Sequence, residues 1–196
     1  KAPDWVETMP YRSDEEPDVD KEFLVCSDEA TLLYMANLGC IEMNPWSSTA
    51  KKPNHPDWCI LDLDPSEKTD FEVVIEIARL IYDLLQAADV PCFCKTSGSE
   101  GLHIYIPLGQ KYTHEQSTNF AHLIAGLVES EMPKHVSLER SVKKREGKLY
   151  LDYLQNKDQA TVAAPYSVRP KPHAPVSMPL EWEEVKSGLR NPDFTI

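Results

Sequence analysis

The sequence has no apolar run long enough to cross a membrane, and its residues 1–20 are polar and acidic. A spanning helix needs about 18 or more consecutive apolar residues, and a signal peptide needs an apolar segment near the N-terminus. Internal repeats and low-complexity segments are also absent. We therefore expect a globular protein whose 196 residues form one large domain or two small fused modules.

Cysteine is sparse, and its pattern argues against the common metal and redox motifs. The five cysteines are Cys26, Cys40, Cys59, Cys92 and Cys94. Their number is odd, and the two closest are separated by one residue, whereas zinc and dithiol sites favour two. The sequence therefore predicts buried, reduced thiols in a cytoplasmic protein.

Basic residues are too few to balance the acidic ones. The net charge is −12 and the isoelectric point about 4.9, which taken alone argues against nucleic-acid binding. The charge is uneven, however. Residues 134–171 hold nine basic residues against four acidic ones, a local net charge of +5. Because salt screens distant charges over about 8–10 Å, a local basic face can still bind phosphates.

Hydrophobic periodicity predicts strands and helices in mixed order. After an extended lead-in over residues 1–20, we expect strands at 22–26, 40–46, 58–64, 92–96, 102–108, 148–154 and 160–168. We expect helices at 29–39, 71–90, 116–132 and 180–189. Hairpins mixed with helices favour an α+β fold with mainly antiparallel sheet over a doubly wound parallel sheet.

The segment WCILDLDPSEKTD (58–70) places two carboxylates at the end of an apolar strand. Asp62 and Asp64 are two residues apart, so both side chains project from one face. Adjacent carboxylates resist ionising together unless a cation neutralises them, and Mg²⁺ or Mn²⁺ is bound by such oxygens. The alternative is an exposed strand end followed by an ordinary turn at Pro65.

The segment KTSGSEGLHIYIPL (95–108) joins two predicted strands through a Gly-Ser loop. Small residues let backbone N–H groups approach an anion. Ser97 and Ser99 add hydroxyl donors, and His103 begins the following strand. We expect the loop to contact phosphate; the alternative is an ordinary β-hairpin loop.

Two later features complete the set. Asp152 in KLYLDYLQN is an acid on a predicted strand, either a third metal ligand or a solvated polar residue. Arg169 and Lys171, two residues apart in SVRPKP, suit a phosphate or carboxylate. Residues 143–145, Lys-Lys-Arg, are interpreted as a solvated charge run. Together, three carboxylates, a small-residue loop, a histidine and a basic pair match the needs of two-metal nucleotidyl transfer.

These segments resemble the polymerase domain of bacterial DNA ligase D, a member of the archaeo-eukaryotic primase superfamily. The likeness is carried, in order along the chain, by LGCIEMNPW, DLDP, KTSGSEGLHIYIPL, LDYLQN and APYSVRPKPHAPVSMPLEW. It implies a primase-polymerase core with an RRM-like module. It further implies a nucleoid-associated enzyme of non-homologous end joining that extends primers and fills gaps, with a preference for ribonucleotides.

The resemblance also assigns site residues. Asp62, Asp64 and Asp152 would be the catalytic metal ligands for Mn²⁺ or Mg²⁺. Ser97, Ser99, His103, Arg169 and Lys171 would contact the incoming NTP or dNTP. The sequence departs from the family pattern in three places: Glu100 stands where lysine is more common, Asn44 where histidine is common, and Lys171 where arginine is common.

The resemblance predicts one primase-polymerase domain over residues 1–196. It would comprise a lead-in and β-α-β segment (1–56), a catalytic core (57–168) and a C-terminal tail (169–196). The family's N-terminal portion is expected to be absent. Expected partners are a DNA primer-template or broken DNA ends, a Ku-type end-binding protein and a DNA ligase module. Two alternatives stay open, a non-catalytic nucleotide- or nucleic-acid-binding module and a metal-dependent phosphodiesterase.

Overall fold

Residues 1–41 and residues 42–196 form two separate structural units in the computed structural model, which describes residues 2–13, 16–190 and 193–196. In the first unit, β1 (Thr8–Ser13) and β2 (Glu16–Leu24) form an antiparallel hairpin, and α1 (Glu29–Asn37) follows. The predicted helix is confirmed. The predicted extended lead-in is instead a hairpin, apart from residues 14–15, which lie outside the described residues.

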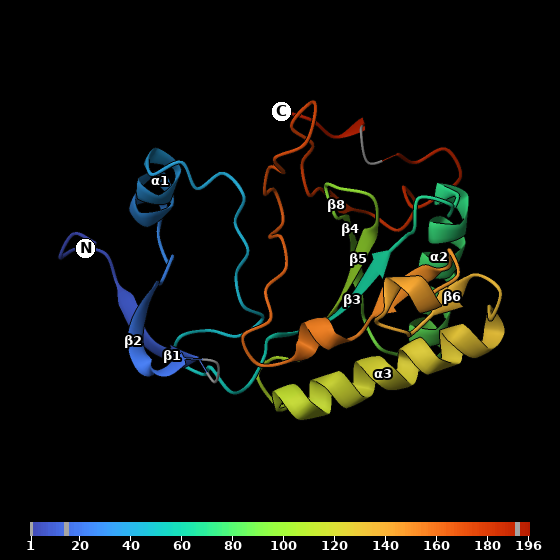
Figure 1. Cartoon of the computed structure of the whole chain (residues 1–196), viewed down its shortest axis with the longest axis horizontal. Coiled ribbons are helices and arrows are strands. Elements are labelled where there is room, and N and C mark those ends of the chain that lie inside the picture. Colours follow the sequence, from blue (N-terminus) through green and yellow to red (C-terminus); the bar gives the residue numbers. More distant parts are fainter. Residues whose placement is uncertain (1, 14–15, 191–192) are drawn as a thin grey trace. The chain divides into compact units, whose positions relative to one another are not determined.

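The second unit is built on a six-stranded sheet with the order β6-β7-β3-β5-β4-β8 (Figure 1). Its strands are β3 (Trp58–Asp64), β4 (Phe93–Thr96), β5 (Leu102–Pro107), β6 (Val136–Ser137), β7 (Leu149–Asp152) and β8 (Pro179–Leu180). All neighbouring strands are antiparallel except β6 and β7. The predicted α+β class with mainly antiparallel sheet is confirmed.

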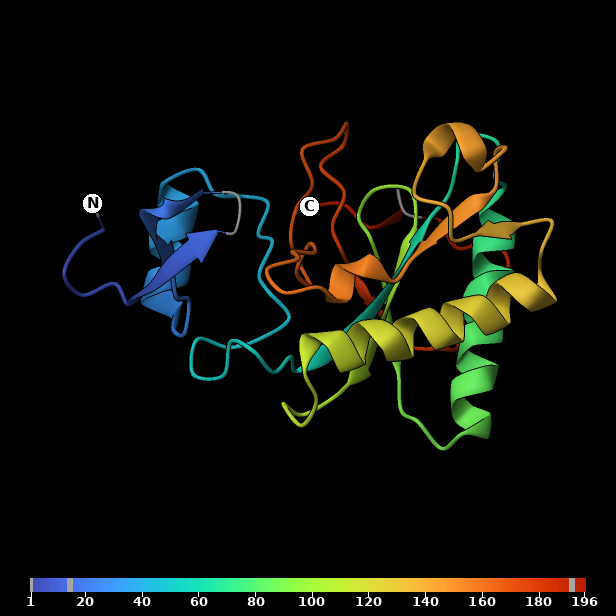
Figure 2. The same cartoon turned by 60° about the horizontal axis from the view of Figure 1, so that its bottom comes forward.

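Two long helices cover one face of this sheet. They are α2 (Phe71–Ala87), whose first turn is capped by Asp70, and α3 (His114–Glu131), which begins with a capping box between Thr113 and Gln116. Figure 2 shows α3 lying across α2. Cys59, Leu61 and Leu63 of β3 are fully buried in the core that these helices complete. Because side chains alternate along a strand, the intervening residues of β3 face the opposite side.

The sheet face opposite the helices is covered by chain without regular secondary structure. Hydrophobic periodicity had wrongly predicted strands in this part of the chain. The predicted strands at 40–46 and 160–168 are absent; these segments form isolated bridges at Trp46–Thr161 and Val168–Val176. Pro45 and Pro165 interrupt ladder pairing, since proline lacks an N–H. Both segments line a cavity over the sheet face, so they cross the sheet instead of extending its edge.

The predicted helix at 180–189 is also wrong, since Leu180 ends β8 and the residues after it form turns and bends. Side-chain anchors explain the difference. Trp182 donates its indole N–H to the Cys92 carbonyl (2.9 Å), and Arg79 of α2 donates to the Val185 carbonyl (2.7 Å). Val185 is fully buried. Tertiary contacts therefore override the helical propensity of the segment.

The structure also bears on membrane-spanning helices and on the state of the cysteines. Within the described residues, no helix is long and apolar enough to span a membrane. None of the five cysteines, all of which are described, forms a disulfide. Cys59, Cys92 and Cys94 are buried as predicted, whereas Cys26 is exposed.

Asn156 extends the ladder of β3 where β7 has ended. It lies in a 3₁₀ turn, η2 (Leu154–Asn156), and is fully buried. Its side-chain oxygen accepts from the Ile60 N–H (2.7 Å), and its side-chain nitrogen donates to the Ile60 carbonyl (2.7 Å). Ser117 of α3 donates to the same oxygen at 3.0 Å. One side chain thus replaces a strand partner two residues before Asp62.

We expect Asn156→Ala to lower the free energy of unfolding by about 2–4 kcal/mol, because it leaves both backbone groups of Ile60 unpaired in the interior. Urea unfolding measures the change. Asn54→Ala, at an exposed loop position, is the matched control and should change stability by less than about 0.5 kcal/mol. Equal effects of the two substitutions would contradict the anchoring role of Asn156.

Candidate active site

A row of polar side chains crosses four strands on the sheet face opposite the helices. The register places Asp62 of β3 opposite Asp152 of β7 on one side and opposite His103 of β5 on the other. Lys95 of β4 is in turn opposite His103. Directly opposed residues share a face, so the order across the sheet is carboxylate, carboxylate, imidazole, ammonium.

Contacts along this row connect each group to the next. Asp62 Oδ1 lies 3.4 Å from His103 Nε2, and His103 Nδ1 lies 2.8 Å from Lys95 Nζ. Lys95 also donates to the Ser177 hydroxyl, which donates to the Thr96 carbonyl at 2.8 Å. Lys95 and His103 are only 2% and 4% exposed. Burial therefore lowers the pKa of Lys95 to about 7 and, together with the nearby Lys95 charge, lowers that of His103.

Asp62 lies beside two further carboxylates, Asp64 and Asp152. Burial, followed by the charges of Asp64 and Asp152, raises its pKa to about 7. Lys95 and Arg169 oppose this effect more weakly. An added cation near Asp62 would relieve both the desolvation and the repulsion, which is the electrostatic signature of a metal-binding carboxylate.

The other two carboxylates have protein partners of their own. Asp64 Oδ2 is 3.3 Å from Arg145 Nη1, and the Arg145 guanidinium lies 3.9 Å from the centre of the Tyr150 ring. Asp152 accepts from the Tyr150 hydroxyl (3.1 Å), the Leu154 N–H (2.8 Å) and the Gln155 amide (3.1 Å). Arg145, interpreted from the sequence as part of a solvated charge run, is instead fixed in the site with its side chain only 14% exposed.

The donor set fits a hard divalent cation by chemistry. Asp62, Asp64 and Asp152 share one sheet face, and carboxylate oxygens are the ligands that Mg²⁺ and Mn²⁺ prefer. Among the described residues, however, no three metal-ligating side chains are drawn together into a ready metal cluster. Asp64 and Asp152 are each turned toward hydrogen-bond donors of the protein, and Asp62 lies beside His103.

The Gly-Ser loop and the basic pair come together at the neighbouring end of the sheet. Arg169 Nη1 donates to the Ser97 carbonyl at 2.7 Å. Lys171 Nζ donates to the Ser99 hydroxyl and, at 3.0 Å, to Glu100. The Ser97 hydroxyl accepts the backbone N–H groups of Ser99 (3.0 Å) and Gly101 (3.1 Å). The structure thus brings Arg169 and Lys171 onto Ser97 and Ser99, from which they are 72 residues away in the sequence.

Glycine is required at two positions of this loop. Gly98 has φ +68°, and a Cβ there would lie 2.7 Å from the Arg169 side chain. A Cβ on Gly101 would lie 1.8 Å from the Leu63 carbonyl. The loop can therefore pass close to both Arg169 and the end of β3 only because these side chains are absent.

Lys95 and Arg145 are the site residues that sequence reasoning left without a role. Both contacts depend on register, which brings β4 beside β5 and a distant turn beside β3. The available signal for Lys95 was a charged residue inside a short apolar strand. No local signal marked Arg145.

Comparison with known proteins identifies the family. The family model described as "LigD, primase-polymerase domain" matches residues 1–196. The chain belongs to the LigD primase-polymerase domain family. It is 36% identical over 196 residues to the bifunctional non-homologous end joining protein LigD of Bacillus subtilis, covering all of this chain and 31% of that protein.

More distant members give the same result. The multifunctional non-homologous end joining protein LigD of Pseudomonas aeruginosa is 33% identical over 156 residues, which cover 80% of this chain and 19% of that protein. A solved polymerase domain from Mycobacterium tuberculosis ligase D, in complex with DNA, matches with a TM-score of 0.87 and 28% identity. That match covers 96% of this chain and 68% of the other. The chain spans less than a third of the length of these two full-length LigD relatives.

The electrostatics of Asp62 predict a pH-dependent stability. Its pKa rises from 3.8 to about 7 on folding, so the folded state retains a proton that the unfolded state releases between these values, and stability falls as pH rises through the window. Asp62→Asn mimics the protonated form. In metal-free buffer at pH 8 it should raise the free energy of unfolding by about 1–3 kcal/mol, and the gain should vanish near pH 4.

Urea unfolding at pH 4, 6 and 8 checks this expectation. Asp83→Asn, at an exposed position of α2, serves as the control and should show no such pH-dependent gain. A loss of stability in Asp62→Asn at pH 8 would show that the protein around Asp62 favours its charged form.

Proposed function

We propose that the chain is a metal-dependent nucleotidyltransferase that adds nucleotides to a primer 3′-hydroxyl. The observation that carries this proposal is the juxtaposition on one sheet face of three carboxylates with a cationic, hydroxyl-rich loop region. Family membership supports the same reaction class. Primer extension and gap filling in non-homologous end joining, with ribonucleotides preferred, form the specific activity that we propose.

Members of the family are metal-dependent, and Asp62, Asp64 and Asp152 are the residues that would hold Mn²⁺ or Mg²⁺. A bound metal of this kind supplies charge stabilisation and activates a hydroxyl nucleophile. Arg145 and Gln155 hold two of the three carboxylates in place beforehand. These hydrogen bonds thus hold the carboxylates on one sheet face while keeping them apart.

The remaining site residues are suited to a triphosphate. Lys95 Nζ lies 2.8 Å from His103 Nδ1. A protonated Lys95 can only donate there, which places the proton of a neutral imidazole on Nε2, facing the site. Arg169, Lys171 and the hydroxyl groups of Ser97 and Ser99 supply further donors. We propose that these five groups, including His103, hold the phosphates beside the carboxylates.

Residues 1–196 would act together as one primase-polymerase domain.

The proposed partners follow from the relatives. The M. tuberculosis polymerase domain was solved in complex with DNA, and we propose a primer-template or broken DNA end as the nucleic acid bound here. A Ku-type end-binding protein and a ligase module complete the proposed repair assembly. The basic segment at residues 134–171 supports contact with a phosphate backbone.

A second candidate function is a nucleotide-binding module without polymerase activity. It is favoured by the protein partners that already engage Asp64, Asp152 and Lys171. Binding of labelled nucleotide without primer extension would support this candidate. Products shorter than the primer would instead indicate phosphodiesterase activity.

The double substitution Asp62→Ala, Asp64→Ala should reduce Mn²⁺-dependent primer extension to background while the circular dichroism spectrum is retained. Removing two of three carboxylates removes the charge that a divalent cation requires. Asp83→Ala, on the exposed side of α2, should extend primers at the wild-type rate. Undiminished extension by the double variant would overturn the proposed mechanism.

Glu100→Gln should lower KM for the nucleotide about two- to fivefold with little change in kcat, because the exposed pair with Lys171 is weak and opposes phosphate binding. Lys171→Gln should raise KM. The pair of opposite shifts distinguishes a charge effect from general damage to the loop. Glu115→Gln, at an exposed position of α3, controls for the change in net charge, and unchanged KM in both loop variants would place the phosphates elsewhere.

A further inference from the structure

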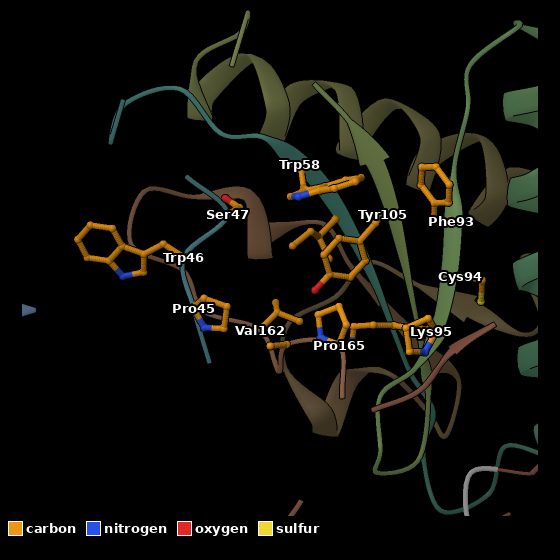
Figure 3. Close-up of a pocket in the computed structure, with 13 residues that line it drawn as sticks. Pro45, Trp46, Ser47, Trp58, Phe93, Cys94, Lys95, Tyr105, Val162 and Pro165 are labelled. Carbon is orange, nitrogen blue, oxygen red and sulfur yellow. The ribbon is translucent and has the colours of Figure 1, made fainter. Parts of the chain in front are cut away.

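The Lys95 ammonium lies behind the candidate site, on the far side of His103 from the carboxylates. Lys95 lines a cavity of about 250 Å³ on the polar sheet face together with Tyr105 (Figure 3), and its nitrogen is 5.6 Å from the centre of the Tyr105 ring. Only 2% of Lys95 is exposed. The ammonium is therefore too deeply buried to bind a phosphate itself, and its partners are groups of the protein.

Three groups that can accept hydrogen bonds surround the Lys95 nitrogen. They are His103 Nδ1, the Ser177 hydroxyl oxygen and, at 3.4 Å, the Thr96 carbonyl. Ser177 donates its own proton to the Thr96 carbonyl, so its oxygen is left to accept. An ammonium group has three protons and no lone pair. Each proton thus has an acceptor, and this favours the charged form of Lys95 against the effect of burial, which lowers its pKa to about 7.

The Lys95 charge restricts what the His103 ring can do. A ring nitrogen that accepts a hydrogen bond carries no proton, so the neutral imidazole bears its proton on Nε2. Burial, followed by the charges of Lys95 and Arg169, lowers the pKa of His103, which keeps the ring neutral. Nε2 is the nitrogen on the side of Asp62, 3.4 Å from its Oδ1. On the side of the carboxylates, His103 can therefore donate a proton to a hydrogen bond but cannot accept one.

The order of charges around the ring has a chemical consequence. In a catalytic triad, a carboxylate behind the imidazole stabilises the imidazolium and so makes the ring a base. An ammonium in the same position disfavours protonation of the ring and polarises its N–H toward an anion in front. Ser177, which is fully buried, follows Arg169 and Lys171 in the C-terminal segment. The segment that carries these two basic residues thus also holds Lys95 behind His103.

We propose that Lys95 is a positioning residue that makes His103 a hydrogen-bond donor to the triphosphate and prevents it from acting as a general base. The inference deepens the proposed function and rests on it for the identity of the anion. Ser177 and Thr96 direct Lys95 toward the ring, and Lys95 acts on the nucleotide only through His103.

Nitrogen-15 NMR of the histidine-labelled full chain reads the tautomer directly, because protonated and unprotonated ring nitrogens differ widely in chemical shift. At pH 6, Lys95 is mainly charged and His103 neutral. The chain has six histidines, and the His103 signals are those lost in His103→Gln. We expect a proton on Nε2 and none on Nδ1. A proton on Nδ1, or on both nitrogens, overturns the proposal, and this measurement needs only the wild-type fold.

The substitution Lys95→Met keeps the length of the side chain and removes its donors. It should raise KM for the nucleotide in primer extension about five- to twentyfold and change kcat less than about threefold. It should also allow a proton on Nδ1 in the NMR spectrum. Lys111→Met, at an exposed position after β5, is the matched control and should leave KM and the spectrum unchanged.

A double-mutant cycle tests whether Lys95 acts through the ring. In the His103→Gln background, Lys95→Met should change KM less than about twofold. The same rise in KM in both backgrounds would show that Lys95 acts independently of His103 and would overturn the proposal, as would an unchanged KM and spectrum in Lys95→Met alone.

The two readouts separate this inference from the proposed function. Primer extension by a wild-type chain whose His103 carries its proton on Nδ1 would refute the role of Lys95 and leave the polymerase function standing. A proton on Nε2 that depends on Lys95, in a chain that neither extends primers nor binds ATP in calorimetry, would refute the proposed function and support the control of His103 by Lys95.

Discussion

The position of Asp62 between Asp152 and His103 is the constraint on which the site depends. Antiparallel pairing of β3 with both β7 and β5 brings the three residues level on one face. Burial disfavours the charged form of Asp62, and repulsion from Asp64 and from the directly opposed Asp152 adds to this effect, so the pKa of Asp62 is raised. Such an arrangement is costly for stability and suits a site that a cation completes.

The fold places stabilising contacts around this costly centre. Asn156 holds β3 immediately before Asp62, Arg145 engages Asp64, and Lys95 supports His103 from the far side. The opposite face of the same strands carries the apolar core that packs on α2 and α3. One face therefore supplies the rigidity, and the other carries the polar chemistry.

Sequence reasoning reached the features that depend on local pattern. Two-residue alternation placed Asp62 and Asp64 on one face, and hydrophobic periodicity located α2 and α3. It could not predict features that depend on the register between strands or on contacts between residues far apart in the sequence. Lys95 acquires its role only when β4 lies beside β5, and Arg145 only when a distant turn meets Asp64. The irregular segments at 40–46 and 160–168 have the composition of strands. They cross the face of the sheet, however, and so cannot hydrogen-bond along its edge.

The same irregular segments give the site its second half. They line a cavity on the sheet face beside the carboxylates, and the chain that follows residue 168 brings Arg169 and Lys171 onto the Gly-Ser loop. Family membership accounts for the core. In this chain Glu100 of the Gly-Ser loop forms an ion pair with Lys171 at 3.0 Å.

The most direct test of the account is a Mn²⁺ titration of the purified chain followed by electron paramagnetic resonance, with and without ATP. The account predicts that Mn²⁺ binds, that ATP tightens its binding, and that Asp152→Asn weakens binding in both conditions. Mn²⁺ binding that is identical in the wild-type chain and in Asp152→Asn would contradict the claim that the carboxylates of β3 and β7 form one metal site.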